Sequence, residues 1–423
     1  MTGKPREVDV LIVGAGPAGL AAGAELAAAG AGRVEILERE QQAGGIPRHC
    51  HHGGFGGVLD RTAYAWSSAA RSAPTPRGTT GPAYARRGVA AAVAAGAALR
   101  TGVTATGWAG PRTLETTGPA GLERITARAV VLATGARERP RSARLVPGTR
   151  PPGVYTTGEL QQAVHLYGQR IGTRAVVVGD EPVGHAAVAT LRAAGVHVVA
   201  VVTDRPATAL RPRSTRTPVL TGATVTELTG RTRLSGVGLR HDDGRTTTLR
   251  CDTVVLTGDF VPDHELARRG GILLDPGTRG PAYDAAYRTS QPGVFAVGNL
   301  LHAVERAGHA AQEGRAVAVS VLHRLAGTEE PAGGGRRLVV DAPLRWIAPN
   351  VTGPDGARPP GDRFVLRTAV RLSRPLLVVS QDGRELHRRR LLSAAVPGRP
   401  FRLAADWADR VDPDGSAVRI SAL

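Results

Sequence analysis

Three glycines near the N-terminus have the spacing that holds a phosphate group. Gly14, Gly16 and Gly19 form a G-x-G-x-x-G turn, in which Pro17 and Ala18 precede the last glycine. In such a turn the first glycine allows a tight bend, the second lets the backbone approach a pyrophosphate, and the third lets a helix lie close to a strand. The N–H groups and the positive dipole end of that helix then face the phosphates. The pattern predicts dinucleotide binding, and the alternative is a tight strand–helix turn that binds nothing.

The residues around this turn predict the strand, helix and second strand that such a site needs. An apolar run at 8–13 precedes the turn, an alanine-rich helical stretch at 17–29 follows it, and a second apolar run covers 34–37. Glu38 ends that second run, nineteen residues after Gly19. This is close to the spacing at which a carboxylate accepts a hydrogen bond from an adenosine ribose. We therefore expect the turn and Glu38 to bind one dinucleotide together.

A glycine-rich loop at 41–56 carries a run of potential metal ligands, His49, Cys50, His51 and His52. Adjacent residues point in divergent directions, whereas zinc sites usually space their ligands two to five residues apart. We therefore expect no metal site. Two alternatives remain for Cys50, which is either a thiol beside a cofactor or a packed thiol without a chemical role.

A second strand–turn–helix–strand unit covers about 175–202, and its turn at 179–184 is an altered copy of the first. Glu181 replaces the middle glycine, so its side chain obstructs the backbone approach and its charge repels a pyrophosphate. Asp204 nevertheless lies twenty residues after Gly184, where a ribose carboxylate belongs. The unit either binds a nicotinamide nucleotide, NAD(P), or keeps the fold without the site, and Glu181 favours the second interpretation.

Two further glycine turns follow predicted strands. The strand at 124–132 leads into Thr134 and Gly135, and a short strand at 293–297 leads into Gly298 and Asn299. Open α/β sheets bind ligands at the carboxyl ends of their strands, so both turns are candidate ligand contacts. After about residue 336 the pattern changes to short alternating segments separated by turns, which predicts a small antiparallel β domain without a motif of chemistry.

Length and composition restrict the class of protein. With 423 residues the chain is long enough for two or three domains. It has no run of 18 apolar residues and no signal-peptide pattern, so we expect no transmembrane segment. Its two cysteines, Cys50 and Cys251, indicate a reducing compartment, and we expect the protein in the cytoplasm. The net charge of +18 comes almost wholly from dispersed arginine with only 4% aromatic residues, which argues against nucleic-acid binding.

Together these segments resemble the flavoproteins with two dinucleotide-binding domains, a group that includes the pyridine nucleotide-disulfide reductases. The resemblance covers about residues 6–328. It implies an α/β fold of two Rossmann-like domains, an FAD domain at 1–155 and 259–330 and an NAD(P)-binding-like domain at 156–258. The alternating pattern near the C-terminus adds a small β-rich domain at 336–423. The implied FAD contacts are Gly14, Gly16, Pro17, Ala18, Gly19, Glu38, Arg39, Gly45, Ile46, Val103, Thr134, Gly135, Gly298 and Asn299. Asn299 stands where the family has an aspartate on the flavin ribityl chain.

A narrower resemblance is carried by segments 44–50, 81–87, 153–162 and 257–266. They are similar to the FAD subunit of heteromeric amino- and imino-acid dehydrogenases, such as hydrogen cyanide synthase, opine oxidase and D-hydroxyproline dehydrogenase. This resemblance implies a separate iron–sulfur component, together with a second flavoprotein subunit that oxidises the C–N bond of a small-molecule substrate. The chain departs from that group because it has no cysteine after Cys251. It also has no C-x₂₋₄-C pair, which excludes dithiol chemistry of the disulfide-reductase kind.

Three functions follow from these patterns. The first is an FAD-dependent oxidoreductase that serves as one component of a multi-component amine or imino-acid dehydrogenase. The second is a self-contained NAD(P)H-dependent flavin reductase or diaphorase, which needs the altered second turn to bind nucleotide. The third is an FAD-stabilised assembly subunit without catalysis. No side chain stands out from the sequence as a catalytic acid or base.

Overall fold

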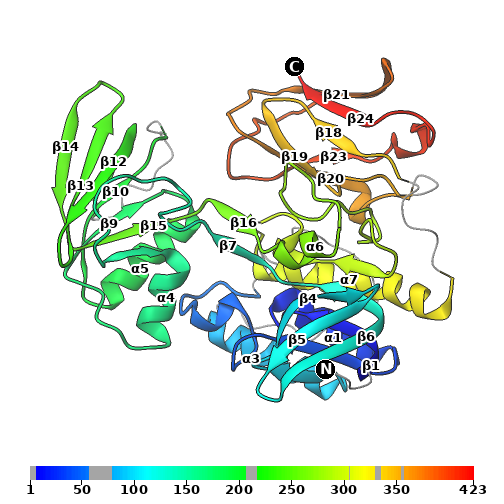
Figure 1. Cartoon of the computed structure of the whole chain (residues 1–423). Coiled ribbons are helices and arrows are strands. Elements are labelled where there is room, and N and C mark those ends of the chain that lie inside the picture. Colours follow the sequence, from blue (N-terminus) through cyan, green and yellow to red (C-terminus); the bar gives the residue numbers. More distant parts are fainter. Residues whose placement is uncertain (1–5, 57–78, 206–216, 304, 329–334, 354–356) are drawn as a thin grey trace.

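The structure, a computed structural model, describes residues 6–56, 79–205, 217–303, 305–328, 335–353 and 357–423. Figure 1 shows three parts: one in blue, cyan and yellow, a green part beside it, and a C-terminal part in orange and red. They contain the predicted FAD domain, the NAD(P)-binding-like domain and the β-rich domain, in that order. The predicted two-domain α/β fold is confirmed by the sheet topology. The exact limits of the domains stay a prediction.

The first part is built on a seven-stranded sheet with the order β3-β2-β1-β6-β5-β4 and β17 beside β6. Its strands are β1 (Arg6–Val13), β2 (Val34–Glu38), β3 (Ala98–Thr101), β4 (Thr104–Gly110), β5 (Thr113–Gly118), β6 (Gly121–Leu132) and β17 (Val294–Ala296). β1 pairs in parallel with both β2 and β6, which is the topology of a dinucleotide-binding unit. Its helices are α1 (Pro17–Ala28), α3 (Gly81–Ala94) and α7 (Ala307–Ala326), and α1 contacts the other two.

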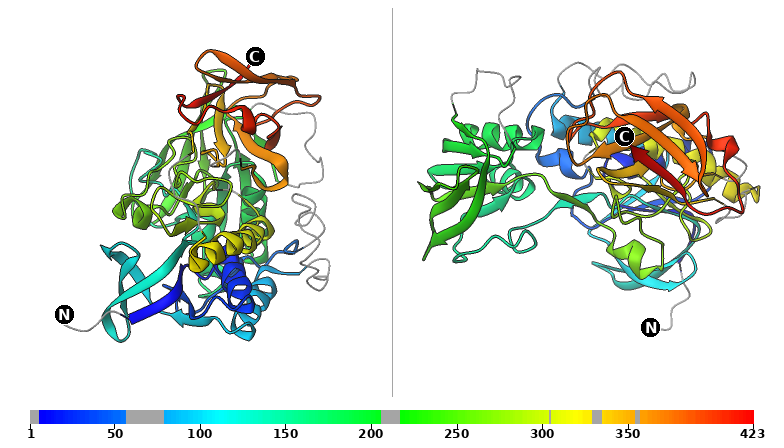
Figure 2. Two further views of the ribbon diagram at one scale, coloured as in Figure 1. Left: turned by 90° about the vertical axis from the view of Figure 1, so that its right-hand side faces the viewer. Right: turned by 90° about the horizontal axis from the view of Figure 1, so that it is seen from above.

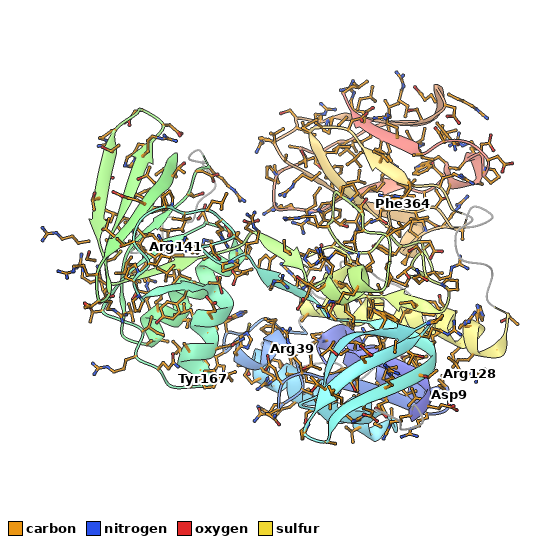
Figure 3. All side chains as sticks on the ribbon, viewed as in Figure 1. Asp9, Arg39, Arg128, Arg141, Tyr167 and Phe364 are labelled. Atoms are coloured by element: carbon orange, nitrogen blue, oxygen red, sulfur yellow. The ribbon has the colours of Figure 1, made fainter. Side chains whose placement is uncertain are left out.

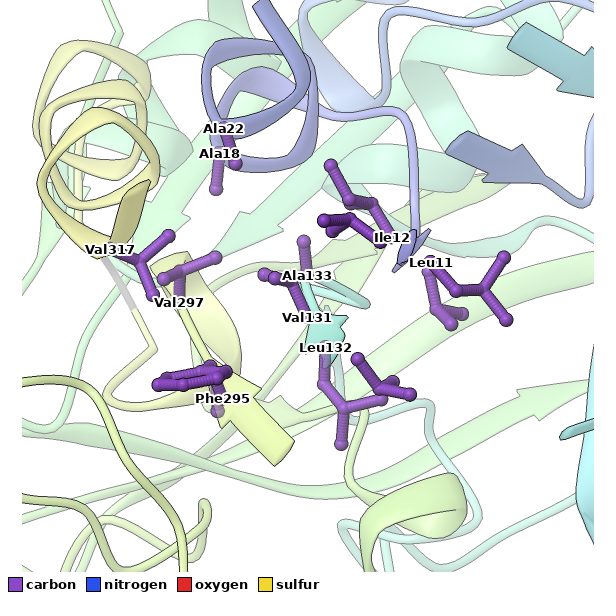
Figure 4. Packing of buried hydrophobic residues seen from close by; sticks show 14 of the residues in the cluster. Leu11, Ile12, Ala18, Ala22, Val131, Leu132, Ala133, Phe295, Val297 and Val317 are labelled. Atoms are coloured by element: carbon purple, nitrogen blue, oxygen red, sulfur yellow. The ribbon is translucent and has the colours of Figure 1, made fainter. Parts of the chain in front are cut away.

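The main core lies where this sheet meets α1 and α7. Ile12 of β1, Val131 of β6 and Phe295 of β17 lie in register, and Figure 4 shows them on the side of the sheet that faces Val317 of α7, whereas Leu11 of β1 points to the other side. All five side chains are buried. Leu11 and Ile12 point to opposite faces of β1 and both are buried, so the strand is covered on both faces and reads as a continuous apolar run in the sequence.

The second part has a five-stranded parallel sheet with the order β11-β10-β9-β15-β8. Its elements are β8 (Val154–Thr156), α4 (Thr157–His165), β9 (Arg174–Val178), α5 (Pro182–Ala193), β10 (His197–Val202), β11 (Val219–Leu220) and β15 (Thr253–Leu256). A separate antiparallel sheet of β12 (Ala223–Gly230), β13 (Leu234–His241) and β14 (Thr246–Arg250) packs beside it. The chain enters and leaves this part through β7 (Ala136–Glu138) and β16 (Phe260–Pro262), which pair in an antiparallel ribbon, and α6 (Glu265–Arg269) follows.

The C-terminal part consists of two small sheets, β18-β24-β21-β22 and β19-β20-β23. Its strands are β18 (Leu338–Val340), β19 (Leu344–Ala348), β20 (Arg363–Thr368), β21 (Leu376–Gln381), β22 (Arg384–Arg390), β23 (Phe401–Ala404) and β24 (Val418–Ala422). The expectation of a purely antiparallel domain is wrong for one pair, because β18 and β24 run in parallel. Phe364 lies inside this domain and stacks on Trp407 with ring centroids 5.0 Å apart (Figure 3).

The C-terminal part shares a core with the first part. Trp346, Ala348 and Val365 of its second sheet belong to the same hydrophobic cluster as the strands of the first sheet. Figure 2 shows α7, in yellow, beside α1, in blue, and beneath the C-terminal domain. Among the described residues, no helix is long and apolar enough to cross a membrane.

Candidate cofactor site

The first and third glycines of the N-terminal turn are required by the fold itself. Gly14 has φ of +105°, and a Cβ atom there would overlap the carbonyl oxygen of Ala133. A Cβ atom on Gly19 would overlap the carbonyl oxygen of Gly14. These two positions therefore bring α1 against the ends of β1 and β6, as the sequence predicts.

Gly16 differs from both, because a side chain there would meet no close neighbour among the described residues. A Cβ atom at this position would have no neighbouring atom within 4 Å. Gly16 is the N-cap of α1, and no side chain caps that helix end. Gly45 lies on the other side of the backbone, where its own Cβ would come 2.8 Å from the Gly16 Cα. An uncapped helix N-terminus beside open space fits the pyrophosphate of a dinucleotide.

Glu38 is buried at the end of β2 and fixes the turn. One carboxylate oxygen accepts a hydrogen bond from Ala15 N at 3.1 Å, and the other accepts one from Glu40 N at 2.9 Å. Val103 donates its N–H to the carbonyl oxygen of Glu38 at 2.9 Å. A carboxylate oxygen accepts two hydrogen bonds, so Glu38 retains capacity for the hydroxyls of a ribose.

Asp263 connects three of the predicted site residues to the strand that returns from the second part. The Thr134 hydroxyl donates to the Asp263 carbonyl oxygen at 2.7 Å, and Asp263 N donates to the Gly135 carbonyl oxygen at 2.8 Å. The exposed Arg39 forms an ion pair with the Asp263 carboxylate at 3.2 Å (Figure 3). In the structure these residues hold the segment after β16, and their contact with a cofactor stays a prediction.

Gly298 and Asn299, at the start of the short helix η2 (Gly298–Leu300), lie next to the N-terminal turn. A Cβ atom on Gly298 would come 2.8 Å from the Ala18 Cβ, so this position adjoins the N-terminal turn. The Asn299 side chain donates to the Glu305 carbonyl oxygen at 3.2 Å and accepts from Glu305 N at 2.9 Å. An ionised aspartate has no N–H to donate, so this pair of hydrogen bonds explains the asparagine.

Comparison with known proteins decides the family, because residues 8–314 match the model of the pyridine nucleotide-disulphide oxidoreductase family. The chain belongs to this family. The assignment confirms the prediction of an FAD-dependent oxidoreductase. It also supports a flavin as the cofactor, and the position of that cofactor at Gly16 stays a prediction.

Two curated relatives are similar to most of this chain. The chain is 29% identical over 374 residues to the alpha subunit of sarcosine oxidase from Corynebacterium sp. (strain P-1), a match over 82% of this chain and 36% of that protein. It is 27% identical over 328 residues to an opine oxidase subunit from Rhizobium meliloti, a match over 69% of this chain and 58% of that protein. The chain thus spans about a third to three fifths of the length of these two relatives.

The fold alone is shared with thioredoxin reductase from T. acidophilum, with a TM-score of 0.58 at 23% identity, over 75% of this chain and 98% of the reductase. L-proline dehydrogenase from P. horikoshii has a TM-score of 0.53 at 17% identity, over 78% of this chain and 58% of that one.

This member of the pyridine nucleotide-disulphide oxidoreductase family has a packed cysteine beside the site. Cys50 follows the short helix η1 (Ile46–His49), and its Sγ donates to the Gln161 side chain of α4 at 3.3 Å. Burial, together with the charge of Glu138, raises the pKa of Cys50 to about 12, so the thiol stays protonated at neutral pH. Of the two alternatives for Cys50, this favours a packed thiol.

The neighbouring histidines do not gather as metal ligands. Burial lowers the pKa of His49 to about 4, so its ring is neutral, and His51 stacks on His165 at 4.1 Å between ring centroids. Within the part of the chain that the structure describes, no three His, Cys, Asp or Glu side chains are arranged to hold a metal.

The second turn contains a carboxylate where a dinucleotide phosphate would lie. The predicted strand–helix–strand unit is present as β9, α5 and β10, and Gly179 has φ of +126°. The Glu181 carboxylate accepts a hydrogen bond from the Thr257 hydroxyl at 2.8 Å. A Cβ atom on Gly258 would overlap the same carboxylate, so Glu181 fills the space between two glycine turns. Asp204 is exposed just after β10.

Proposed function

We propose that this chain is the FAD-carrying subunit of a multi-component enzyme that oxidises a small amine or imino acid. The observation that carries the proposal is the match of most of the chain to one named subunit in each of two systems, sarcosine oxidase and opine oxidase. Because the chain spans only part of those subunits, its substrate and its partners belong to the proposal. The proposed partners are a separate iron–sulfur component and a second flavoprotein subunit. The cytoplasm is the proposed compartment.

Different residues of the first part would contact different portions of FAD. Gly16 and the N-terminus of α1 would receive the pyrophosphate, and Glu38 would accept hydrogen bonds from the adenosine ribose. Gly298, which lies against Ala18, would border the ribityl chain. When bound, FAD supplies the electron-accepting chemistry, and the protein supplies its position and environment.

The second turn supports electron delivery by a partner protein. Glu181 places a carboxylate at the turn where a nucleotide phosphate would bind, and its negative charge would repel the negative charge of the phosphate. Cys50 and Cys251 lie in different parts of the fold, and both are free thiols. We therefore propose that the flavin of this chain exchanges electrons with a partner protein, without a nicotinamide or a dithiol in this chain as intermediate.

Comparison of the co-purified complex with the isolated chain tests this function. The tagged chain is isolated from its native cells together with its bound proteins, and a second sample is purified alone. Both are mixed anaerobically with sarcosine, an opine and a cyclic imino acid while flavin absorbance is recorded. We expect one of these substrates to bleach the flavin of the complex and none to bleach the isolated chain. Bleaching of the isolated chain by an amine would show that it needs no partner and would refute the proposal.

A further inference from the structure

A cluster of buried charged side chains lies where α7, the segment after η2 and the C-terminal domain meet. We call it the His302 cluster; its members are His302, Glu305, His309, Glu313 and Arg367. His302 is 3% exposed and Arg367 is 8% exposed. Burying charges is costly unless they are paired, so a cluster of this kind requires a specific arrangement.

Glu305 connects the C-terminal domain to Asn299. Its carboxylate accepts a hydrogen bond from the Arg367 guanidinium at 3.1 Å and lies 3.0 Å from the His309 ring nitrogen. Its backbone N–H and carbonyl oxygen are the two groups that hold the Asn299 side chain. One residue therefore joins β20 to the predicted contact with the flavin ribityl chain.

Glu313 of α7 makes the corresponding connection to Gly298. One carboxylate oxygen accepts a hydrogen bond from Gly298 N at 2.8 Å, and the other lies 3.1 Å from the His302 ring nitrogen. The His302 ring lies against Trp346 of β19, with centroids 5.4 Å apart. Both predicted flavin contacts thus depend on carboxylates whose other partners lie in, or against, the C-terminal domain.

Arg367 is held firmly enough to fix this arrangement. A second guanidinium nitrogen donates to the Gly398 carbonyl oxygen at 2.9 Å, and the guanidinium carbon lies 5.6 Å from the centre of the Trp346 ring. A planar guanidinium suits this combination of two hydrogen bonds and an aromatic face, which a lysine ammonium cannot reproduce. Figure 2 shows the C-terminal domain over α7, where these contacts occur.

We propose that Arg367 is a positioning residue for the flavin site: acting through Glu305, it makes the C-terminal domain hold Asn299 and the adjoining Gly298 in the conformation that receives FAD. The inference rests on the proposed FAD site in the first part. It assigns to the C-terminal domain a role in cofactor binding. Without Arg367, the buried Glu305 carboxylate loses its fixed cation, and the backbone that holds Asn299 is free to shift.

A second ion pair across the same boundary supplies the control. Arg337 of the C-terminal domain binds Asp275 of the first part at 3.1 Å, and neither residue is bonded to the His302 cluster. Loss of either pair weakens the attachment of the two domains. In the part of the chain that the structure describes, Glu313 and Glu305 form hydrogen bonds with Gly298 and Asn299, whereas Arg337 and Asp275 form none with them. We therefore expect loss of the Arg367 pair to disturb Gly298 and Asn299 more than loss of the Arg337 pair.

The test compares purified Arg367→Gln, Arg367→Lys and Arg337→Gln with the wild-type chain. FAD dissociation constants are measured by flavin fluorescence, unfolding by circular dichroism, and the flavin environment by its absorbance spectrum. We expect Arg367→Gln to weaken FAD binding by roughly 5- to 150-fold, the usual range for coupling between two sites. We also expect it to shift the spectrum of the flavin that remains bound. Arg367→Lys should restore part of the affinity, and Arg337→Gln should keep both the affinity and the spectrum of the wild type.

Wild-type affinity and spectrum in Arg367→Gln would overturn the inference, and so would an equal loss of affinity in Arg337→Gln. Glu305→Gln preserves the shape of the side chain and removes its charge, so it provides the second variant should Arg367→Gln fail to fold. Glu305→Gln must also weaken FAD binding, and unchanged binding in this variant overturns the inference. A wild-type chain that binds no FAD would instead refute the proposed function itself.

Discussion

Substitution of Gly16 by alanine should separate cofactor binding from folding. The backbone at Gly16 has φ of −80° and ψ of −174°, which any residue adopts, and the added methyl group meets no protein atom. The methyl group would instead occupy the space into which the pyrophosphate is expected to come. The apo fold should therefore tolerate the change while FAD binding does not.

Two opposing effects set the expected change in the stability of the apo-protein. Alanine is a poorer N-cap than glycine by up to about 1 kcal/mol, whereas replacing glycine restricts the unfolded chain and returns about 0.4–1 kcal/mol. The stability of the apo-protein should thus change by less than about 1 kcal/mol. Displacing the pyrophosphate enough to lose one charge-assisted hydrogen bond costs about 1.5–3 kcal/mol, which is roughly a 10- to 150-fold rise in the dissociation constant for FAD.

The assay measures FAD content after dialysis together with unfolding of the apo-protein by circular dichroism. Gly19→Ala is the matched structural control, because its methyl group overlaps the Gly14 carbonyl oxygen. It should lower the unfolding temperature even without cofactor. Full FAD occupancy in Gly16→Ala would refute the assignment of the N-terminal turn to the pyrophosphate.

Three further outcomes are expected. Glu181→Gly should create measurable NADH or NADPH binding by calorimetry without loss of FAD, and equal binding by the wild-type chain would show that the carboxylate is no barrier. Cys50 and Cys251, whose pKa values burial raises to about 12 and about 11, should resist a disulfide reagent at pH 8 and react after unfolding; rapid reaction of the native chain would contradict their burial. Although burial alone lowers the pKa of His302, Glu313 raises it overall above its ordinary value of 6.5. Its contribution to stability is therefore complete below pH 6.5 and is lost as the pH rises through the raised pKa, so unfolding temperatures of the wild type and His302→Gln should converge at alkaline pH.

The N-terminal unit was predictable because every signal in it is local. The three glycines, the apolar runs and Glu38 lie within one stretch of sequence, and each has a steric or hydrogen-bonding requirement that the structure displays at Gly14 and Gly19. The presence of a carboxylate in the second turn was predictable for the same reason, since Glu181 at a position that needs glycine is visible without coordinates, and its effect on nucleotide binding stays a prediction. Its hydrogen bond to Thr257 joins residues 76 positions apart and was not predictable.

The C-terminal domain was less predictable, because one of its strands is rich in arginine and lacks the apolar alternation that predicts a strand. β22 reads RELHRRR and has no apolar alternation, although it forms the edge of a sheet. Arginines suit an exposed edge, where they discourage pairing with other chains. A pattern search based on apolar periodicity therefore passes over this strand.

The His302 cluster was not predictable, because its members become neighbours only through the packing of two domains. Arg367 lies 62 residues from Glu305, and nothing in their local sequences links them. Asn299, in place of the family's aspartate, was the single local sign. By itself this substitution does not identify Glu305 as the partner of Asn299.

Anaerobic mixing of the purified FAD-bound chain with NADH and with NADPH tests whether the flavin accepts electrons from a nicotinamide nucleotide. FAD is expected in the first part, and the Glu181 carboxylate fills the nucleotide position of the second part, so flavin absorbance should stay unchanged at millimolar nucleotide. Dithionite, which needs no binding site, should bleach the same sample and thereby show that the flavin is reducible. Rapid bleaching by either nucleotide would contradict electron exchange with a partner protein alone and would identify the chain as a self-contained NAD(P)H-dependent flavin reductase.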